Sequence, residues 1–238
     1  MKTVLITGGS RGIGRAMVEA FCNEGYAVAF TYRSAEDDAR TLSLATGALA
    51  IRADSANEAD VINAVKDAEK ALGHIDCLVN NAGISSFSLF TDLTLEQWNQ
   101  HMAVNLTGAF LYSREVSRGM VSRKEGRIIN ITSMWGIVGS SCEVHYSTAK
   151  AGLIGMTKAL AKELGPSGIT VNAIAPGLIM TDMNRSLSDE DIAAVAEETP
   201  LMRAGLPSEV ARAAVFLAGD GASFITGEIM NVSGGYIM

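Results

Sequence analysis

Short apolar runs alternate with longer amphipathic stretches along most of the chain. Seven of these runs are candidate strands, and most are rich in Val and Ile without alternating polar residues, as is typical of strands in a parallel sheet covered on both faces. They span residues 3–7, 27–31, 48–52, 76–80, 127–132, 170–174 and 228–232. Between the first two, Ile13, Met17 and Phe21 recur at helical spacing. This repetition of strand, helix and strand predicts an α/β fold with one doubly wound, seven-stranded parallel sheet.

Polar signals mark where some helices begin. Thr94 and Gln97 form a capping-box pattern that predicts a helix reaching about Arg118, and Ser188 with Asp191 is a weaker version of it. Another helix is expected to hold Tyr146 and to end near residue 165. Residues 178–206 are too long for a simple crossover and are expected to form a lid over the strand ends, with a decorative surface helix as the alternative. No linker divides residues 1–238, so we expect a single domain.

Composition narrows the class of protein. The 238 residues are 48% hydrophobic and 19% charged, enough to bury one sizeable core. The net charge of −7 argues against general binding to nucleic acid or to anionic membranes. Cys22, Cys77 and Cys142 have no metal-binding spacing and are odd in number, so we expect no metal site and a reducing compartment. No targeting or membrane-spanning pattern is evident, which predicts a cytoplasmic protein.

A glycine-rich turn directly follows the first strand and opens the first helix. Gly8, Gly12 and Gly14 would let backbone N–H groups approach a pyrophosphate at the helix N-terminus. A glycine triplet can also be an ordinary turn, but its place in a strand–turn–helix unit favours dinucleotide binding. The residues of the turn expected to contact the cofactor are Thr7, Gly8, Ser10, Arg11, Gly12, Ile13 and Gly14.

The end of the second strand indicates which dinucleotide is bound. An acid usually holds a free ribose 2′-hydroxyl there, but the chain reads Thr31-Tyr-Arg33-Ser and has no acid before Glu36. Arg33 and Arg11 together could hold a 2′-phosphate, or both could be solvated surface residues. NADPH is therefore favoured over NADH.

Tyr146 and Lys150 are candidates for the chemistry. Their separation of four residues places them on one face of a helix. An ammonium near a phenol lowers the pKa of the tyrosine, which could then donate a proton to a carbonyl oxygen. Ser133 ends the fifth strand, at the sheet edge where ligands bind, and could donate to the same oxygen. A serine in that position can also be a simple turn residue.

Four motifs occur in a characteristic order: Gly8-x-x-x-Gly12-x-Gly14 after Thr7, Asn80-Asn81-Ala82-Gly83, Ser133, and Tyr146-x-x-x-Lys150. In this order they resemble the short-chain dehydrogenase/reductase family, over essentially the whole chain. The resemblance implies a Rossmann-type fold and a catalytic set of Ser133, Tyr146, Lys150 and Asn105. It also implies that Asn105 kinks its helix and holds a water that connects Lys150 to solvent.

The same resemblance implies further cofactor contacts. Tyr146 and Lys150 would lie at the nicotinamide end, with Lys150 bonded to the ribose. The remaining residues that it assigns to NADP(H) are Asp54, Ser55, Asn81, Ala82, Gly83, Pro176, Gly177, Ile179 and Thr181.

Two substrates are suggested by similarity within the family. Residues 168–177 and 224–228 are most similar to 3-oxoacyl-[acyl-carrier-protein] reductases. However, Ser85-Ser-Phe87 replaces the usual Thr-Arg-Asp of those enzymes, and Ser167 stands where they tend to carry an arginine for docking the carrier. Residues 133–146 resemble a branch that reduces a ketone-bearing lysine adduct on elongation factor P. The candidate substrate-pocket residues are Ser133, Trp135, Cys142, Glu143, His145 and Met183, and Glu143 could attract a substrate amine.

These observations predict an NADPH-dependent carbonyl reductase that acts on a small-molecule or carrier-bound ketone, without nucleic-acid or membrane partners. The resemblance also implies a homotetramer. A cofactor-binding sensor or scaffold would usually have lost part of the Ser–Tyr–Lys set, which is complete here. An epimerase or dehydratase acting on a nucleotide sugar would need a longer C-terminal substrate domain.

Overall fold

The computed structural model describes residues 1–181 and 188–237 of the chain. All seven strands run parallel, in the order β3-β2-β1-β4-β5-β6-β7, which confirms the predicted doubly wound sheet. The strands are β1 (Thr3–Ile6), β2 (Ala27–Tyr32), β3 (Leu49–Arg52), β4 (Cys77–Asn80), β5 (Gly126–Ile131), β6 (Ile169–Pro176) and β7 (Ile229–Val232).

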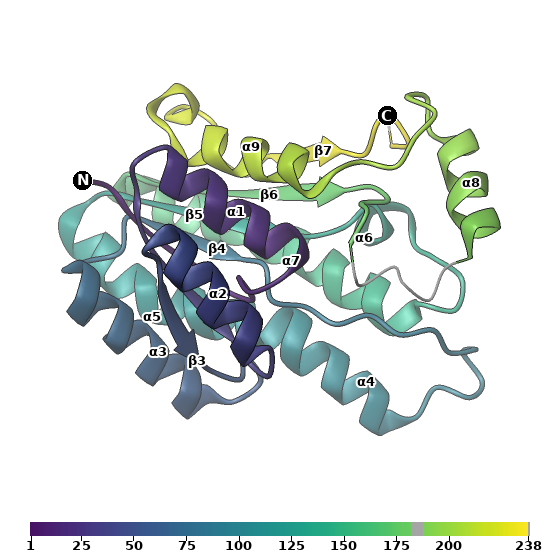
Figure 1. Cartoon of the computed structure of the whole chain (residues 1–238), viewed down its shortest axis with the longest axis horizontal. Coiled ribbons are helices and arrows are strands. Elements are labelled where there is room, and N and C mark those ends of the chain that lie inside the picture. Colours follow the sequence, from purple (N-terminus) through teal and green to yellow (C-terminus); the bar gives the residue numbers. More distant parts are fainter. Residues whose placement is uncertain (182–187, 238) are drawn as a thin grey trace.

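Helices cover both faces of the sheet, and Figure 1 shows this layered arrangement. The helices are α1 (Gly12–Asn23), α2 (Glu36–Thr46), α3 (Glu58–Leu72), α4 (Leu95–Met102), α5 (Gly108–Arg123), α6 (Trp135–Val138), α7 (Val144–Leu164), α8 (Asp189–Glu198) and α9 (Pro207–Ala218). Side chains of α1, α2 and α9 pack on one face, and those of α3, α5 and α7 pack on the other. The site lies where the strands end, between these two layers.

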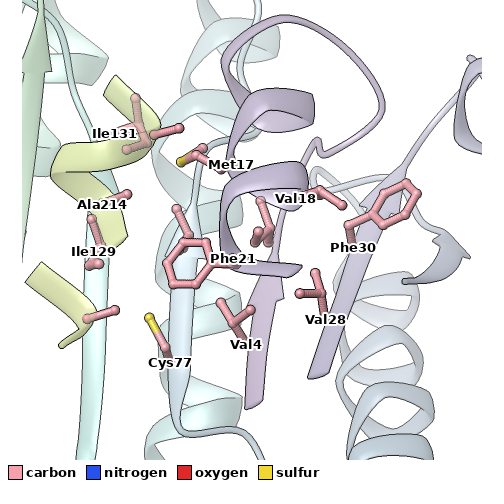
Figure 2. Close-up of a cluster of buried hydrophobic side chains, with 14 of the residues drawn as sticks. Val4, Met17, Val18, Phe21, Val28, Phe30, Cys77, Ile129, Ile131 and Ala214 are labelled. Carbon is pink, nitrogen blue, oxygen red and sulfur yellow. The ribbon is translucent and has the colours of Figure 1, made fainter. Parts of the chain in front are cut away.

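The apolar side chains of each strand pack into two separate cores, because successive side chains point to opposite faces of the sheet. In β1, Val4 and Ile6 enter the core beneath α1 and α9, whereas Leu5 enters the core beneath α3 and α5. Figure 2 shows the first core, in which Phe21 of α1 lies among strand side chains and is fully buried. Burial of a side chain of this size contributes about 1.5–3 kcal/mol. Both faces being covered explains why the strands lack polar alternation.

The helix expected from Thr94 to about Arg118 is divided in the structure. The predicted capping box is present, since the Thr94 hydroxyl accepts from the Gln97 amide and the Gln97 side chain accepts from the Thr94 amide. After α4, however, Ala103–Thr107 forms a π-helical turn before α5 begins. Such turns have no clear sequence signature and are frequent at functional sites.

The weaker pattern at Ser188 also forms a complete capping box. The Ser188 hydroxyl accepts from the Asp191 amide, and the Asp191 carboxylate reaches the Ser188 amide at 3.1 Å. Aspartate therefore serves here in place of the longer glutamate or glutamine.

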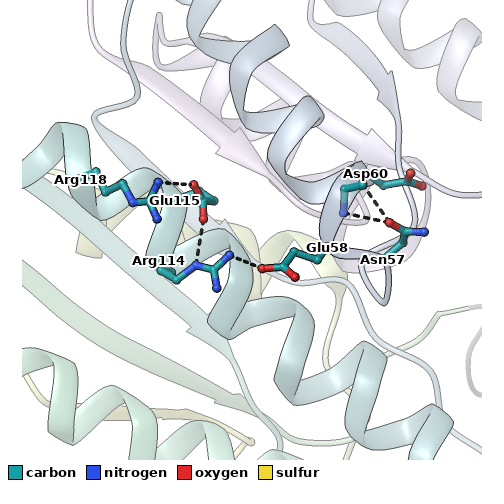
Figure 3. A network of polar contacts seen from close by, with 7 residues as sticks. Asn57, Glu58, Asp60, Arg114, Glu115 and Arg118 are labelled. Atoms are coloured by element: carbon teal, nitrogen blue, oxygen red, sulfur yellow. Dashed lines mark hydrogen bonds and ion pairs between the residues drawn. The ribbon is translucent and has the colours of Figure 1, made fainter.

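A charged network joins the outer surfaces of α3 and α5 (Figure 3). The Arg114 guanidinium lies 2.6 Å from Glu58 of α3 and 2.9 Å from Glu115, which also contacts Arg118. At the start of α3, the Asn57 side chain accepts from the first backbone amides of the helix. These contacts stabilise the helical layer that contains α3 and α5.

No helix within the described ranges has the length and apolar character needed to cross a membrane.

Candidate active site

The strand order changes direction between β1 and β4, and this point opens a crevice at the carboxyl ends of the strands. A cavity of about 920 Å³ lies there. It is lined by the segments that follow β1, β2, β4, β5 and β6 and by part of α8. Ligand sites in doubly wound folds occupy this position, so the cavity is the candidate active site.

The glycine-rich turn forms one wall of the cavity. Gly8 and Gly12 have φ angles of +66° and +54°, a region that glycine adopts readily. A Cβ on Gly14 would lie 2.1 Å from the Gly8 carbonyl oxygen, so the start of α1 can approach the turn this closely only without a side chain.

Thr7 and Asn81 fix this turn to the end of β4. The Thr7 hydroxyl accepts from the backbone amides of Asn81 and Ala82, at 2.9 Å each. The Asn81 side chain donates to the carbonyls of Thr7 and Gly8, at 3.0 Å each. Thr7 itself is buried and does not line the cavity, so its role is to support the turn.

The geometry fits the phosphate groups of a dinucleotide. Among the described residues no side chain caps α1, so the amides of its first turn remain available to a phosphate. Arg11 and Arg33 both line the cavity with exposed side chains, while Asp54 lines it and also accepts from the Ala56 amide.

Most of the predicted cofactor residues meet at this cavity. Apart from Thr7, those lining it are Gly8, Ser10, Arg11, Gly12, Ile13, Gly14, Arg33, Asp54, Ser55, Asn81, Ala82, Gly83, Tyr146, Lys150, Pro176, Gly177, Ile179 and Thr181. The motif resemblance thus selected residues that are dispersed in sequence but share one surface. Within the part of the chain that the structure describes, no cluster of His, Cys, Asp and Glu is arranged to hold a metal.

Ser133, Tyr146 and Lys150 converge at the other end of the cavity. Ser133 follows β5, and the other two lie on α7. The Lys150 ammonium is buried, donates to the Ile131 carbonyl at 2.8 Å and lies 5.6 Å from the centre of the Tyr146 ring. The Thr132 hydroxyl donates to the Lys150 carbonyl and so ties α7 to the end of β5.

Burial controls the protonation of both groups on α7. It raises the pKa of the Tyr146 phenol to about 12, although the hydrogen bond with Ser133 acts in the opposite direction. It lowers the pKa of Lys150 to about 8. Desolvation of the charged form is the largest cause of both shifts, and it places the pKa of Tyr146 above the ordinary value of a phenol. The expected lowering contribution of Lys150 stays a prediction. The phenol is neutral at pH 7, which is the form that can donate a proton.

Asn105 lies in the π-helical turn and is buried behind the site. Its side chain accepts from the Ile84 amide at 2.8 Å and donates to the Ile84 carbonyl at 2.9 Å. A Cβ on Gly83 would lie 2.9 Å from the Asn105 side-chain oxygen and 3.5 Å from the Lys150 ammonium, so this glycine makes room for both. The helix irregularity at Asn105 agrees with the expected kink, and its water contact stays a prediction.

The predicted substrate residues divide into two groups. Ser133, Trp135 and Glu143 line the cavity, and Trp135 also packs edge-on against Tyr236. Cys142 and His145 do not line it among the described contacts, while Met183 lies outside the described residues.

Glu143 is a buried acid in the cavity wall, not a solvated loop residue. Its side chain is 4% exposed and accepts a hydrogen bond from the Ser85 hydroxyl at 2.5 Å. Burial raises the pKa of this carboxyl, an effect that the Ser85 bond partly offsets.

The expectation that His145 approaches the substrate mouth is wrong. It is fully buried beside His101, because its place on the first turn of α7 directs it toward α4. Sequence spacing gives no sign of this long-range pair.

Some lining residues were not anticipated at all. Ser85, Phe87 and Ser140 come from loops around the start of α7, and Asp191, Ala194 and Val195 come from α8. The three α8 residues have i, i+3, i+4 spacing, which places them on one face of the helix. This spacing is the sequence signal that could have identified them. Figure 1 shows α8 beyond the carboxyl ends of β6 and β7.

Known proteins resemble this chain along its whole length. A family model described as enoyl-(acyl carrier protein) reductase matches residues 8–237. A 3-oxoacyl-[acyl-carrier-protein] reductase of Synechocystis sp. is 44% identical, covering 100% of this chain and 97% of the relative. An acetoacetyl-CoA reductase of Shinella zoogloeoides is 43% identical, covering 98% of each chain.

A solved structure shares the fold closely. The short-chain dehydrogenase/reductase from Serratia marcescens superimposes with a TM-score of 0.93 at 36% identity, covering 99% of this chain and 97% of that one. The family model, the sequence relatives and the solved structure all match this chain over nearly its whole length. The chain therefore belongs to the short-chain dehydrogenase/reductase family of oxidoreductases.

Proposed function

We propose that the protein is an NADPH-dependent reductase that converts a ketone to an alcohol. One observation carries this proposal: a neutral phenol, a serine hydroxyl and a buried lysine meet at one end of a cavity whose other end is a glycine-rich turn at the start of a helix. This arrangement supports proton donation to an oxygen next to the place where a nicotinamide would lie.

Each catalytic residue has a distinct proposed role. The cofactor, when bound, supplies hydride to the carbonyl carbon. Tyr146 donates its phenolic proton to the carbonyl oxygen, and Ser133 donates a hydrogen bond to the same oxygen. Lys150 stabilises the phenolate that remains, and it also bonds the nicotinamide ribose. Asn105 supports the path by which the proton is replaced.

A Tyr146→Phe substitution tests this assignment. Turnover should fall by at least about 100-fold, because positioned acid catalysis contributes about 10²–10⁴. NADPH binding, followed by fluorescence titration, should change little. Tyr236→Phe is the matched control, since its hydroxyl bonds to Glu198 and Tyr236 is not among the residues that line the cavity. Near-normal turnover of Tyr146→Phe would reject the mechanism.

The leading substrate is a 3-oxoacyl thioester. The support is the full-length similarity to 3-oxoacyl-[acyl-carrier-protein] reductases and to an acetoacetyl-CoA reductase. The test is oxidation of NADPH with acetoacetyl thioesters, with and without acyl carrier protein. A rate enhancement by the carrier would support docking of this partner.

Glu143 favours a second candidate substrate, a ketone that also carries an amine, such as the lysine adduct on elongation factor P. A buried carboxyl in the cavity wall can bind a cationic group, and it adds nothing for an uncharged acyl chain. Comparison of the adduct with acetoacetyl thioesters decides between the two. A Glu143→Gln variant that loses activity only on the amine-bearing ketone would support the second candidate.

The finer assignments belong to the same proposal. Arg11 and Arg33 support NADP(H) over NAD(H), because both line the cavity and residues 27–35, which form and follow the second strand, contain no acid. A cytoplasmic location, a homotetramer and a lid formed by residues 178–206 stay predictions. For the lid, the support is the face of α8 that lines the cavity.

A further inference from the structure

Two buried histidines lie beside Tyr146, and the proposed reaction uses neither. His145 directly precedes Tyr146 on α7, and His101 lies near the end of α4. Their side chains are 0% and 3% exposed, and their ring centres are 3.9 Å apart. The Ser86 hydroxyl lies between them, 3.0 Å from Nε2 of His145 and 3.3 Å from Nε2 of His101.

The surrounding acceptors fix where the protons lie. Nδ1 of His101 is 2.9 Å from the Gln97 carbonyl, which can only accept, so this nitrogen carries a proton. Nδ1 of His145 is buried without a partner among the described residues, and a proton there would be left without an acceptor. Nε2 of His145 therefore carries the proton and donates to Ser86, whose hydroxyl donates onward to His101. All three hydrogen bonds run in one direction, and both rings are neutral.

This chain of bonds is attached to the first turn of α7. Among the described residues no side chain caps the start of this helix. Instead, adjacent serines hold it from the side, since Ser85 bonds Glu143 and Ser86 bonds His145. The Ser88 amide also donates to the Cys142 carbonyl at 2.9 Å.

We propose that Ser86, His101 and His145 are positioning residues that hold the first turn of α7, and so place the Tyr146 hydroxyl next to Ser133 for proton donation. The inference rests on the proposed role of Tyr146 as the proton donor. It adds a requirement that this role alone does not contain. The hydrogen bonds that run from His145 of α7 through Ser86 to His101 of α4, called the link from here on, must be intact. A displacement of about 1 Å at a reacting group can reduce turnover by about 100-fold.

The link is also sensitive to pH, because a protonated His145 would place a charge and an unpaired N–H in a buried site. Burial and the nearby His101 both lower the pKa of His145. The titratable group that acts on it is His101 from α4, which also acts on Glu143 at the start of α7, while residues 85–88 contribute only serine hydroxyls and Phe87. The link is therefore intact at neutral pH and is lost as pH falls through the lowered pKa.

Ser86→Ala removes the hydroxyl between the rings and is the first test. We expect kcat to fall by about 10–100-fold, with the KM for NADPH nearly unchanged, since second-layer contacts typically contribute this much. Ser88→Ala is the matched control: its hydroxyl bonds only to Leu89 among the described residues, and its backbone amide is unaffected. Equal kcat values for the two alanine variants would overturn the proposal.

Two substitutions of His145 separate positioning from folding. Glutamine places a donor near the position of Nε2, so His145→Gln should retain much of kcat and lose the acid decline due to His145. His145→Leu should lose kcat even when fully folded by circular dichroism. The same comparison in a Glu143→Gln background removes the titration of the other nearby group. If His145→Gln left the decline of kcat at acid pH unchanged in that background, the proposal would be contradicted.

Imidazole NMR provides a readout that does not depend on turnover. The chain has only 3 histidines, so each ring can be assigned. We expect His101 protonated at Nδ1 and His145 at Nε2, with a His145 pKa below 6.5, and we expect Ser86→Ala to remove this pattern. A His145 ring that titrates as a free imidazole would overturn the proposal. If the wild-type protein reduced no ketone, the proposed function would fail while these spectra still reported on the link.

Discussion

The two ends of the active-site cavity are built by different means. The cofactor end is made by backbone: glycines bring β1, α1 and the end of β4 together, and Thr7 and Asn81 bond to main-chain groups. The catalytic end is made by side chains that ionise, namely Lys150 and Glu143, which are buried, and Tyr146, which is half-buried. The cofactor end depends on the close approach of backbone segments to one another, and the catalytic end depends on the protonation states of its side chains. Substitutions should therefore fail in different ways at the two ends.

The largest effect is expected at the backbone-built end. In Gly14→Ala the added methyl would lie 2.1 Å from the Gly8 carbonyl and 2.7 Å from the Asn81 side chain, so the turn must deform. We expect loss of measurable NADPH binding and about 1–3 kcal/mol of destabilisation. Fluorescence titration and thermal unfolding measure the two effects. Gly155→Ala, which has no described neighbour within 4 Å of the added methyl, should be neutral; comparable NADPH binding by both variants would refute the distinction.

Lys150→Met tests the ionisable end. We expect kcat to fall by about 100-fold or more. The protein should still bind cofactor through the untouched turn, with an affinity lowered by loss of the proposed ribose contact. The wild-type pH profile should decline above about pH 8, where Lys150, with its pKa of about 8, loses its positive charge. Tyr146, with a pKa of about 12, remains protonated through that range. The residual activity of Lys150→Met should lack the alkaline decline, and its persistence would assign that decline to another group.

A moderate effect is expected from Arg33→Ala, which removes one of the two arginines proposed to hold the 2′-phosphate at the cofactor end. A charge-assisted hydrogen bond contributes about 1.5–3 kcal/mol, so the KM for NADPH should rise by about tenfold or more while the KM for NADH changes little. Arg15→Ala is the matched control, because Arg15 pairs with Glu19 on the outer side of α1 and does not line the cavity. A parallel rise for both cofactors would argue against a 2′-phosphate site.

The smallest effect is expected outside both ends. Arg114→Ala disrupts the network of Figure 3, in which Glu58 and Arg118 are exposed, Arg114 is half-buried and Glu115 is the most buried member. Exposed ion pairs contribute little and are screened by salt. Cofactor binding and kcat should be unchanged, and a slight decrease in melting temperature should vanish at high ionic strength. A change in kcat would show that α5 transmits strain to the site.

The backbone-built end could be predicted well from the sequence. Its signals are local, since the glycine spacing, the preceding strand and the missing acid before Glu36 all occur within short segments. The same holds for the seven strands, because an unbroken apolar run has few alternative structures. Thr7 was the exception, since a side chain that supports the turn from below has the same sequence pattern as one that faces the cofactor.

The ionisable end could be predicted only in part. The spacing of Tyr146 and Lys150 indicated a shared helix face, but the direction of the Tyr146 pKa depended on burial, which spacing does not report. The burial of Glu143 and the pairing of His101 with His145 depend on segments more than 40 residues apart in the chain. The π-helical turn at Asn105 arises where α4 and α5 meet the site, and the apolar pattern runs through it unchanged.

A short bridge at the base of the segment after β6 has a consequence for how such an enzyme can diverge. Ile179 pairs with Gly205, and backbone bonds join Met180 to Gly205 and Gly205 to Leu178. These bonds hold the two ends of the segment together next to the end of β6. The entropy of closing a loop grows only with the logarithm of its length, by about 0.6 kcal/mol for each doubling. Insertions, deletions and exchanges between these anchor points therefore cost the fold little, and substrate preference can evolve there while the hydride-transfer machinery is inherited intact.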